Sequence, residues 1–276
     1  MVGTGVATEQ PSVCTRLLTP SLVGINWSAI KNVDAVIHLA ANNDTLCDDE
    51  EEMMLANFHA PTMLFKHCLD MGCRTFVYAS SASVYGNAPH PQTEDGPLAP
   101  LNFYAQSKLR FETFARNFAE QNSVSVTGLR YFNVYGPGEQ HKGRRASMVS
   151  QIVEAAKCGR AIKLFKHGEQ RRDWVHVDDV AEINIQAMGL QGHNVVNVGT
   201  GTPVSFREII EIVNKNIQGH HRTAGLEDCE GLNVEWVDCP FADAYQCVTQ
   251  AEIEKADALF GRRLWKQVSE TVPLML

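Results

Sequence analysis

The sequence has no run of about 18 or more apolar residues, the length that a helix needs to cross a membrane. It also has no excess of positive charge, because 24 Lys and Arg residues stand against 32 Asp and Glu residues and give a formal net charge of -8. A chain with this balance lacks the basic surface of a protein that binds nucleic acid or an anionic membrane. We expect neither partner, and any anionic ligand must meet a local cluster of basic residues.

The eight cysteines include no CxxC pair, and their spacing to histidines matches no zinc site. We therefore expect reduced thiols and no bound metal. The first residues, MVGTGVATEQPSVCTR, lack the charged start and the apolar core of a secretory signal. These absences predict a cytoplasmic protein.

The chain has 276 residues, 44% of them hydrophobic, which is enough for a sizeable core. Short apolar segments typical of buried parallel strands cover Asp34–Ala40, Arg74–Ser81 and Val124–Phe132. Amphipathic segments separate them, and the clearest runs from Tyr104 to Gln121 with one face of Phe111, Phe114, Ala115 and Phe118. This alternation predicts an α/β fold with a parallel sheet and crossover helices.

The pattern becomes less regular after about residue 148. We expect a sheet domain over residues 1–147 and a smaller α+β lobe over residues 148–276, with some of its segments returning to the sheet. The lobe is expected to bind mainly the substrate, since a cleft between two lobes is a common ligand site. Within it, Ser205 with Glu208 and Thr249 with Glu252 have the spacing of helix capping boxes.

One helix start carries a tyrosine and a lysine that are suited to proton transfer. Tyr104 and Lys108 are four residues apart, so they share a helix face, and a nearby ammonium favours the phenolate and lowers the pKa of the tyrosine. Ser81 ends the preceding strand, where open α/β sheets bind ligands. The alternative interpretation is an exposed helical pair and an ordinary serine at a strand end.

Several motifs occur together in one order: DAVIHLAA, SSASVYG, YxxxK, RYFNVYGP, RDWVHVDDVA and NVGTG. In this combination the chain resembles the extended short-chain dehydrogenase/reductase family of sugar-nucleotide epimerases and dehydratases, which implies a Rossmann-like sheet. The resemblance implies that Ser81, Tyr104 and Lys108 are catalytic and that Lys108 also holds the nicotinamide ribose. It further implies an NAD or NADP cofactor, a nucleotide-diphosphate sugar as substrate, a homo-oligomer, and cofactor contacts at Ala40, Ala41, Asn57 and Val134.

The residues after Ser81 distinguish between branches of this family. Dehydratases resemble one another in an acidic residue just after the catalytic Ser or Thr, where this chain has Ala82 and Ser83. Without that acid, the resemblance favours epimerisation or simple redox chemistry over elimination.

The loop GEQHKG resembles that of the ADP-heptose 6-epimerases within the family, where a lysine at the position of Lys142 is a second acid/base. Inversion at a fixed cofactor face requires the ketone to turn over, so its oxygen then needs a different proton donor. We expect burial, or the neighbouring His141, Arg144 and Arg145, to lower the pKa of Lys142. Alternatively, this loop contacts only the diphosphate or the cofactor, or is a solvated surface loop.

The same branch implies a set of substrate contacts that includes catalytic Ser81 and extends to Asn133, Arg144, Gln151, Phe165, Arg172 and Tyr245. Arg172 suits a diphosphate because its planar fork binds two oxygens, although it could instead pair with Asp173 or Asp178. Arg144 and Gln151 stand where the resemblance implies a Ser and a His, so the identity of the sugar is not fixed.

The family's N-terminal GxxGxxG turn, which holds the cofactor pyrophosphate, has no counterpart. Gly3 and Gly5 follow no apolar strand and lack a third glycine. We favour a misassigned start or a fragment over a non-catalytic relative or a fold completed by a partner. The function is then an NAD(P)-dependent sugar-nucleotide epimerase, an isomerase, acting on an ADP-heptose through a transient ketone. The alternatives are a UDP-sugar 4-epimerase and a sugar-nucleotide-binding protein without turnover.

Overall fold

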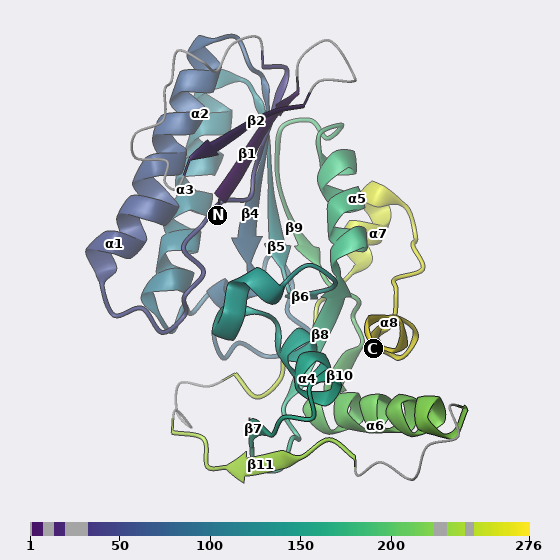
Figure 1. Ribbon diagram of the computed structural model, residues 1–276. Coiled ribbons are helices and arrows are strands. Elements are labelled where there is room, and N and C mark those ends of the chain that lie inside the picture. Colours follow the sequence, from purple (N-terminus) through teal and green to yellow (C-terminus); the bar gives the residue numbers. More distant parts are fainter. Residues whose placement is uncertain (1, 8–13, 20–32, 224–230, 241–245) are drawn as a thin grey trace.

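The central element of the protein is a parallel sheet of four strands, seen in a computed structural model that describes residues 2–7, 14–19, 33–223, 231–240 and 246–276 (Figure 1). Its strand order is β3-β4-β5-β9. The strands are β3 (Ala35–His38), β4 (Thr75–Ser81), β5 (Ser125–Tyr131) and β9 (His193–Val198). Ser81 at the end of β4 pairs with Tyr131 at the end of β5, so both strands finish at the same edge.

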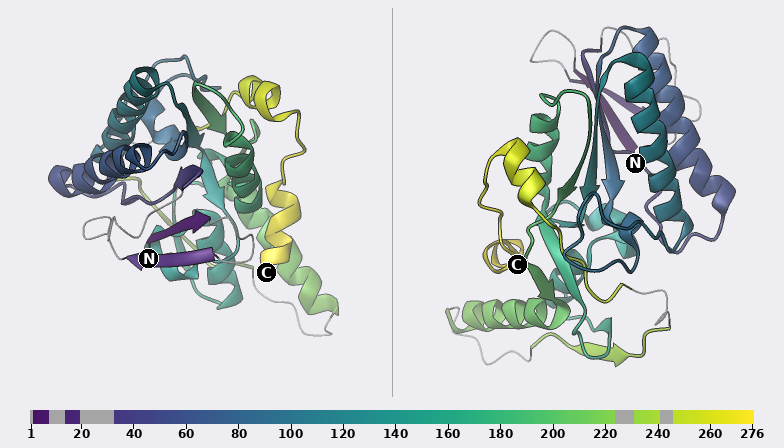
Figure 2. Two further views of the ribbon diagram at one scale, coloured as in Figure 1. Left: turned by 90° about the horizontal axis from the view of Figure 1, so that it is seen from above. Right: turned by 180° about the vertical axis from the view of Figure 1, so that it is seen from behind.

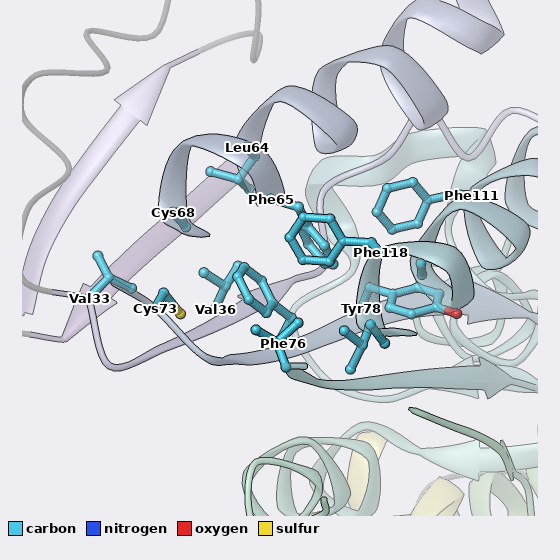
Figure 3. Close-up of a cluster of buried hydrophobic side chains, with 14 of the residues drawn as sticks. Val33, Val36, Leu64, Phe65, Cys68, Cys73, Phe76, Tyr78, Phe111 and Phe118 are labelled. Atoms are coloured by element: carbon cyan, nitrogen blue, oxygen red, sulfur yellow. The ribbon is translucent and has the colours of Figure 1, made fainter. Parts of the chain in front are cut away.

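Helices cover both faces of this sheet, as Figures 1 and 2 show. One face carries α1 (Glu50–Met54), the π-helical turn η2 (Leu55–His59), α2 (Ala60–Asp70) and α3 (Phe103–Asn122). The other face carries α5 (Val177–Ala187) and α7 (Glu254–Phe260). The core between α2, α3 and the sheet contains aromatic rings that pack edge to face or at a tilt, with Phe65, Phe76, Tyr78, Phe111 and Phe118 all buried (Figure 3).

Smaller sheets lie at the carboxyl edge of the central one. They are β6 (Asn133–Tyr135), β8 (Arg171–His176) and β10 (Pro203–Ser205) in the order β10-β8-β6, and the parallel pair β7 (Ile162–Phe165) and β11 (Val234–Val237). The helices around them are η4 (Gln140–Arg145), α4 (Met148–Lys157), α6 (Phe206–Thr223) and α8 (Val268–Met275). Near the start, β1 (Val2–Ala7) and β2 (Cys14–Thr19) form an antiparallel pair of their own.

The long elements agree with the sequence patterns. The three predicted strands are β3, β4 and β5, and the predicted helix is α3, whose face of Phe111, Ala115 and Phe118 is buried. β9 lies beyond residue 148 and pairs with β5, so the later part of the chain does return to the sheet. The domain boundary at 147/148 stays a prediction.

The two proposed capping boxes have different outcomes. Ser205 and Glu208 form theirs, since the Glu208 carboxylate accepts from the Ser205 N–H and the Ser205 hydroxyl accepts from the Glu208 N–H. The expectation for Thr249 and Glu252 is wrong, because α7 begins only at Glu254. The Thr249 hydroxyl instead donates to Asn133 Oδ1 at 3.1 Å, so a tertiary contact takes the place of the cap.

No helix in the described ranges is long and apolar enough to cross a membrane.

Candidate active site

Ser81 lies at the carboxyl end of β4, the edge at which open α/β sheets bind ligands. Its side-chain oxygen accepts a hydrogen bond from the backbone N–H of Ser83 and shares another with the Ser83 hydroxyl. The following turn, η3 (Ala82–Tyr85), therefore presents hydroxyl groups beside Ser81. It carries no acid there, because residues 82 and 83 are alanine and serine.

Tyr104 faces Ser81 from the first turn of α3. The helix begins there because the Asn102 side chain accepts a hydrogen bond from the N–H of Ala105 at 2.9 Å. The Tyr104 side chain forms a hydrogen bond with Ser81, so the two hydroxyl groups predicted to be catalytic do meet. Burial raises the pKa of Tyr104, and this hydrogen bond only partly opposes the rise.

Lys108 lies one turn further along α3 and is almost fully buried, with 5% of its surface exposed. Its Nζ donates a hydrogen bond to the carbonyl oxygen of Ala79 at 2.9 Å and lies 5.8 Å from the centre of the Tyr104 ring. Burial lowers the pKa of Lys108 to about 8, and the negative charge of Glu112 opposes that effect.

The structure corrects the expected pKa of Tyr104. We expected Lys108 to lower it, but burial raises it and no effect of Lys108 opposes that rise. The physical reason is that both groups are desolvated, and the ammonium is bound to the Ala79 carbonyl instead of the phenol oxygen. The cluster therefore holds Tyr104 as a neutral phenol, the form that donates a proton.

Lys142 lies in η4 and has a partner that the sequence interpretation passed over. Its Nζ donates to Glu139 Oε1 at 3.0 Å, with 40% of the lysine side chain exposed. We expected burial or a set of cations to surround it, and the structure shows neither: His141 and Arg144 are themselves exposed, and the contact is with a carboxylate. The structure thus pairs the Lys142 amino group with the Glu139 carboxylate.

Glu139 is held in its charged form by several donors. Its carboxylate accepts from the hydroxyl groups of Ser147 and Ser150 at 2.5 and 2.6 Å and from the N–H of Ser147 at 3.2 Å. Burial on its own would raise the pKa of Glu139, but these hydrogen bonds and Lys142 together lower it. The carboxylate that holds Lys142 is thus itself fixed to the start of α4.

The residues predicted to contact a cofactor fit a nicotinamide ribose at one position. Lys108 Nζ donates to Ala79 within the described residues, and an ammonium has three donors, so it retains capacity for ribose hydroxyls. Ala40 and Ala41 are half-buried in the loop after β3, and Val134 lies in β6 opposite Val175.

The Asn57 side chain, predicted to contact the cofactor, forms hydrogen bonds with other residues of the protein. Its amide oxygen accepts from the N–H of Asn42 at 2.8 Å, and its amide nitrogen donates to Asn42 O at 2.9 Å and to Ser107 Oγ at 3.1 Å. These bonds fix the loop that carries Ala40 and Ala41 against α3. Any contribution of Asn57 to cofactor binding then acts through the shape of that loop.

The pyrophosphate end of a dinucleotide has no matching turn in the described residues. β1 pairs with β2 in a sheet separate from β3, so Gly3 and Gly5 lie within an antiparallel strand and not at a turn from a strand into a helix. The chain thus provides residues for the nicotinamide end, whereas the residues described near its start do not form a phosphate cradle.

The residues predicted to contact substrate lie on several elements beyond the sheet edge. Asn133 begins β6, Phe165 ends β7, and Arg172 lies in β8. Arg172 is 7% exposed and donates to the carbonyl oxygens of Arg171 and Cys247 at 2.9 and 3.1 Å. Tyr245 lies outside the described residues.

Arg144 and Gln151 lie apart from this group. They line a hollow of about 940 Å³ between η4, α4 and α8, and the residues that line it do not include Ser81, Tyr104 or Lys108. The Gln151 amide donates to the carbonyl oxygen of Ala146 at 2.8 Å. The described structure therefore does not gather all of the predicted contacts in one cavity, and we place the active site at the Ser81 cluster because its groups can transfer a proton.

Two ion pairs near the site were missed by the sequence interpretation. The Glu139 partner of Lys142 is three residues away, a spacing that was available as a signal. The other pair, Glu112 with Arg130, is buried and joins α3 to β5. It gave no signal, because nothing in the sequence shows that these two side chains turn inward toward each other.

Comparison with known proteins places the chain in a family. The model of the NAD-dependent epimerase/dehydratase family matches residues 20–199. An ADP-L-glycero-D-manno-heptose-6-epimerase from Brachyspira hyodysenteriae is 37% identical over 235 residues, which are 82% of this chain and 69% of that protein.

Solved structures with the same fold include two with useful sequence similarity. The Helicobacter pylori ADP-L-glycero-D-manno-heptose-6-epimerase has a TM-score of 0.75 and 32% identity, covering 87% of this chain and 70% of that one. MoeE5, solved with UDP-glucuronic acid and NAD, has a TM-score of 0.78 and 28% identity, covering 92% and 82%.

Proposed function

The chain belongs to the NAD-dependent epimerase/dehydratase family, and from this premise we propose that it is a sugar-nucleotide epimerase that inverts C6 of an ADP-heptose. Similarity to heptose 6-epimerases from two organisms supports this substrate. The observation that carries the proposal is the buried cluster of Ser81, Tyr104 and Lys108 at the end of a parallel strand. A phenol, a cation and a hydroxyl in contact are the groups that the oxidation of an alcohol requires.

In this proposal Tyr104 exchanges the proton of the sugar hydroxyl, and Ser81 holds the same oxygen. NAD or NADP, when bound, would supply a reversible hydride acceptor for C6 and, in its oxidised form, a positive charge that favours the Tyr104 phenolate. Lys108 holds the nicotinamide ribose and keeps a positive charge close to the Tyr104 ring. Because burial raises the pKa of Tyr104, the phenol is well suited to return its proton to the ketone oxygen.

Lys142 is the proposed second proton donor. After the ketone turns over, its oxygen points away from Tyr104, and the ammonium held by Glu139 protonates it from the other side. The lack of a carboxylate at residues 82 and 83 supports epimerisation over elimination, because no acid is placed to expel a hydroxyl group.

Replacement of Lys142 tests the two-donor mechanism. We expect Lys142→Ala to lower the rate of epimerisation by about 10²–10⁴-fold, the usual contribution of a general acid, while oxidation of one epimer by the bound cofactor persists. The control is Lys163→Ala, which removes a lysine that is 71% exposed and paired with Glu235 at 3.3 Å. Interconversion of the ADP-heptose epimers followed by NMR measures both variants, and a Lys142→Ala rate near that of wild type would exclude the second donor.

Two other functions are supported by particular observations. Similarity to MoeE5, which was solved with UDP-glucuronic acid, supports a UDP-sugar 4-epimerase, and turnover of UDP-sugars but not ADP-heptose would establish it. The antiparallel pairing of β1 with β2, in which the described glycines Gly3 and Gly5 form no phosphate cradle, supports a sugar-nucleotide-binding protein without turnover. Binding of NADP(H) or NAD(H) to the purified chain, measured by nucleotide fluorescence, distinguishes that last function from both enzymes.

The remaining substrate contacts belong to the same proposal. Arg172 and Phe165 are proposed at the diphosphate and nucleotide, and Asn133, Arg144 and Gln151 at the sugar. The proposed role of Asn133 is supported by the hydrogen bond that the Thr249 hydroxyl donates to Asn133 Oδ1, because this bond orients the Asn133 amide group at the start of β6. Assembly into a homo-oligomer and a cytoplasmic location stay predictions.

A further inference from the structure

A buried ion pair lies directly behind the strand end that carries Ser81. The Arg130 guanidinium binds the Glu112 carboxylate with two parallel hydrogen bonds, Nε to Oε1 at 3.0 Å and Nη2 to Oε2 at 2.7 Å. Each side chain is only 3% exposed. The Ser80 hydroxyl donates to the same carboxylate, so Glu112 joins α3 to both β4 and β5.

These contacts continue into the catalytic cluster through three consecutive residues of β4. The Ala79 carbonyl accepts the hydrogen bond of Lys108, Ser80 donates to Glu112, and Ser81 follows. Glu112 is four residues after Lys108, so successive turns of α3 hold successive residues of the strand. Two hydrogen bonds thus tie the end of β4 that carries Ser81 to the helix that carries Lys108, and Glu112 accepts one of them.

The Arg130 side chain extends the same network away from the site. Its Nη1 donates to the Tyr85 hydroxyl at 2.9 Å and to the Glu94 carbonyl at 3.0 Å, and the Tyr85 hydroxyl donates to Asn197 Oδ1 at 2.6 Å. Arg130 is therefore fixed from β9 and from the loop after η3. A guanidinium held in this way leaves the carboxylate little freedom to move.

The charge of Glu112 also acts on Lys108. Charged or titratable groups of neighbouring elements act on Lys108 or Glu112. They include His38 of β3, Tyr78 of β4, Arg130 of β5 and His193 of β9, and Tyr104 lies beside Lys108 on α3 itself. Burial lowers the pKa of His38 to about 3, so it is neutral at pH 7. Burial also lowers the pKa of Lys108, and Glu112 is the group that opposes this.

A buried ion pair often stabilises a fold no better than apolar residues of the same size would. Its presence at this position therefore suggests a role in the site. We propose that Glu112 is a positioning residue for the catalytic cluster: held by Arg130 and Ser80, its carboxylate fixes the strand end that carries Ser81 and, one helical turn from Lys108, attracts the ammonium of that residue. Only the activity measurement below rests on the proposed epimerase function.

The test uses variants that remove the charge with little change in shape. Glu112→Gln leaves the Arg130 charge buried without its partner, which can itself unfold the protein. The double variant Glu112→Gln/Arg130→Met removes both charges, so a change in the titration of Lys108 can be told apart from a loss of folding. Glu112→Asp keeps the charge, one methylene further back. Glu120→Gln is the control, because Glu120 is an exposed residue of the same helix.

The first measurement titrates Lys108 itself in protein labelled at the lysine side chains, by NMR, with the signal assigned from Lys108→Arg. In wild type we expect titration near the value of about 8. In Glu112→Gln and in the double variant we expect it to fall by about one pH unit or more, the usual effect of removing an opposite charge nearby. Glu112→Asp should restore most of the difference, and Glu120→Gln should leave the titration unchanged.

The second measurement is the dependence of kcat on pH. The decline of kcat at high pH should move to lower pH in the double variant, so that at pH 8 kcat falls about fivefold if the titration shifts by one pH unit. KM should change little. A folded double variant in which Lys108 titrates as in wild type would overturn the proposal. If wild type shows no epimerisation, the proposed function fails, but the titration still decides the role of Glu112.

Discussion

Asp173 is the point at which three distant parts of the chain are joined, and its replacement gives a large expected change in stability. The side chain is fully buried. Oδ1 accepts from the N–H and the hydroxyl of Thr200 at 2.6 and 2.8 Å, and Oδ2 accepts from the N–H groups of Gly201 and Ala251 at 2.8 and 2.9 Å. All four partners are donors, so the site requires a group that only accepts.

Asp173→Asn keeps the size of the side chain but replaces one accepting oxygen with an NH2 group. With the NH2 group at the Oδ2 position, the N–H groups of Gly201 and Ala251 both lose their acceptor. With it at the Oδ1 position, the Thr200 hydroxyl can turn to accept and only the Thr200 N–H loses its acceptor. A buried donor without a partner costs about 1–3 kcal/mol, and the amide takes the orientation that loses one donor, so the expected loss is about 1–3 kcal/mol in the free energy of unfolding. For a domain that is stable by about 5–15 kcal/mol, this is a large fraction.

Urea unfolding followed by circular dichroism measures this change as a lower midpoint at an unchanged slope. The control is Asp238→Asn, the same chemical change at a side chain that is 87% exposed and paired with Lys166 at 3.0 Å. An exposed pair contributes about 0–1 kcal/mol, so the control should unfold close to wild type. If Asp173→Asn stays within 1 kcal/mol of its control, the hydrogen bonds do not hold the segments as described.

Two further predictions concern the core near the site. Gly128→Ala would place a Cβ 2.4 Å from the ring of Tyr78, so we expect a loss of about 1–3 kcal/mol by urea unfolding, whereas Gly189→Ala, whose Cβ would lie 3.4 Å from the Gln186 carbonyl oxygen, should cost less. Burial, assisted by Lys108, lowers the pKa of His38 to about 3, so the unfolded chain takes up a proton before the folded one. Stability should therefore decline as the pH falls below 6.5, by up to about 1.4 kcal/mol per pH unit, and His38→Leu should remove that slope; an equal slope in both proteins would contradict it.

The long elements of the fold were predictable because their patterns are local. Helix α3 repeats its apolar face over 20 residues, and β4 and β5 are mostly buried segments of seven residues each. The strands β6, β7, β10 and β11 have three or four residues, and each pairs with a segment far away in the sequence. Such pairs depend on tertiary contacts, and no local pattern marks them.

The site was predictable as a set of residues, but its electrostatics were not. The motifs identified Ser81, Tyr104 and Lys108, and the structure brings their side chains together. The pKa of Tyr104 was expected to fall and instead rises, because spacing along a helix does not show how much water two side chains lose. For the same reason the acidic partner of Lys142 was passed over in favour of neighbouring cations, although its ammonium group donates to the carboxylate of Glu139.

The measurement that most directly tests the central claim is the fate of the hydrogen at C6 during epimerisation. ADP-heptose that carries deuterium at C6 is incubated with the purified chain and NADP or NAD, and the product is examined by NMR and mass spectrometry. Transient oxidation predicts that the other epimer forms with its deuterium retained, because the hydride leaves C6 and returns to the same carbon. Formation of no epimer, or of an epimer whose deuterium has been exchanged with water, would contradict the account.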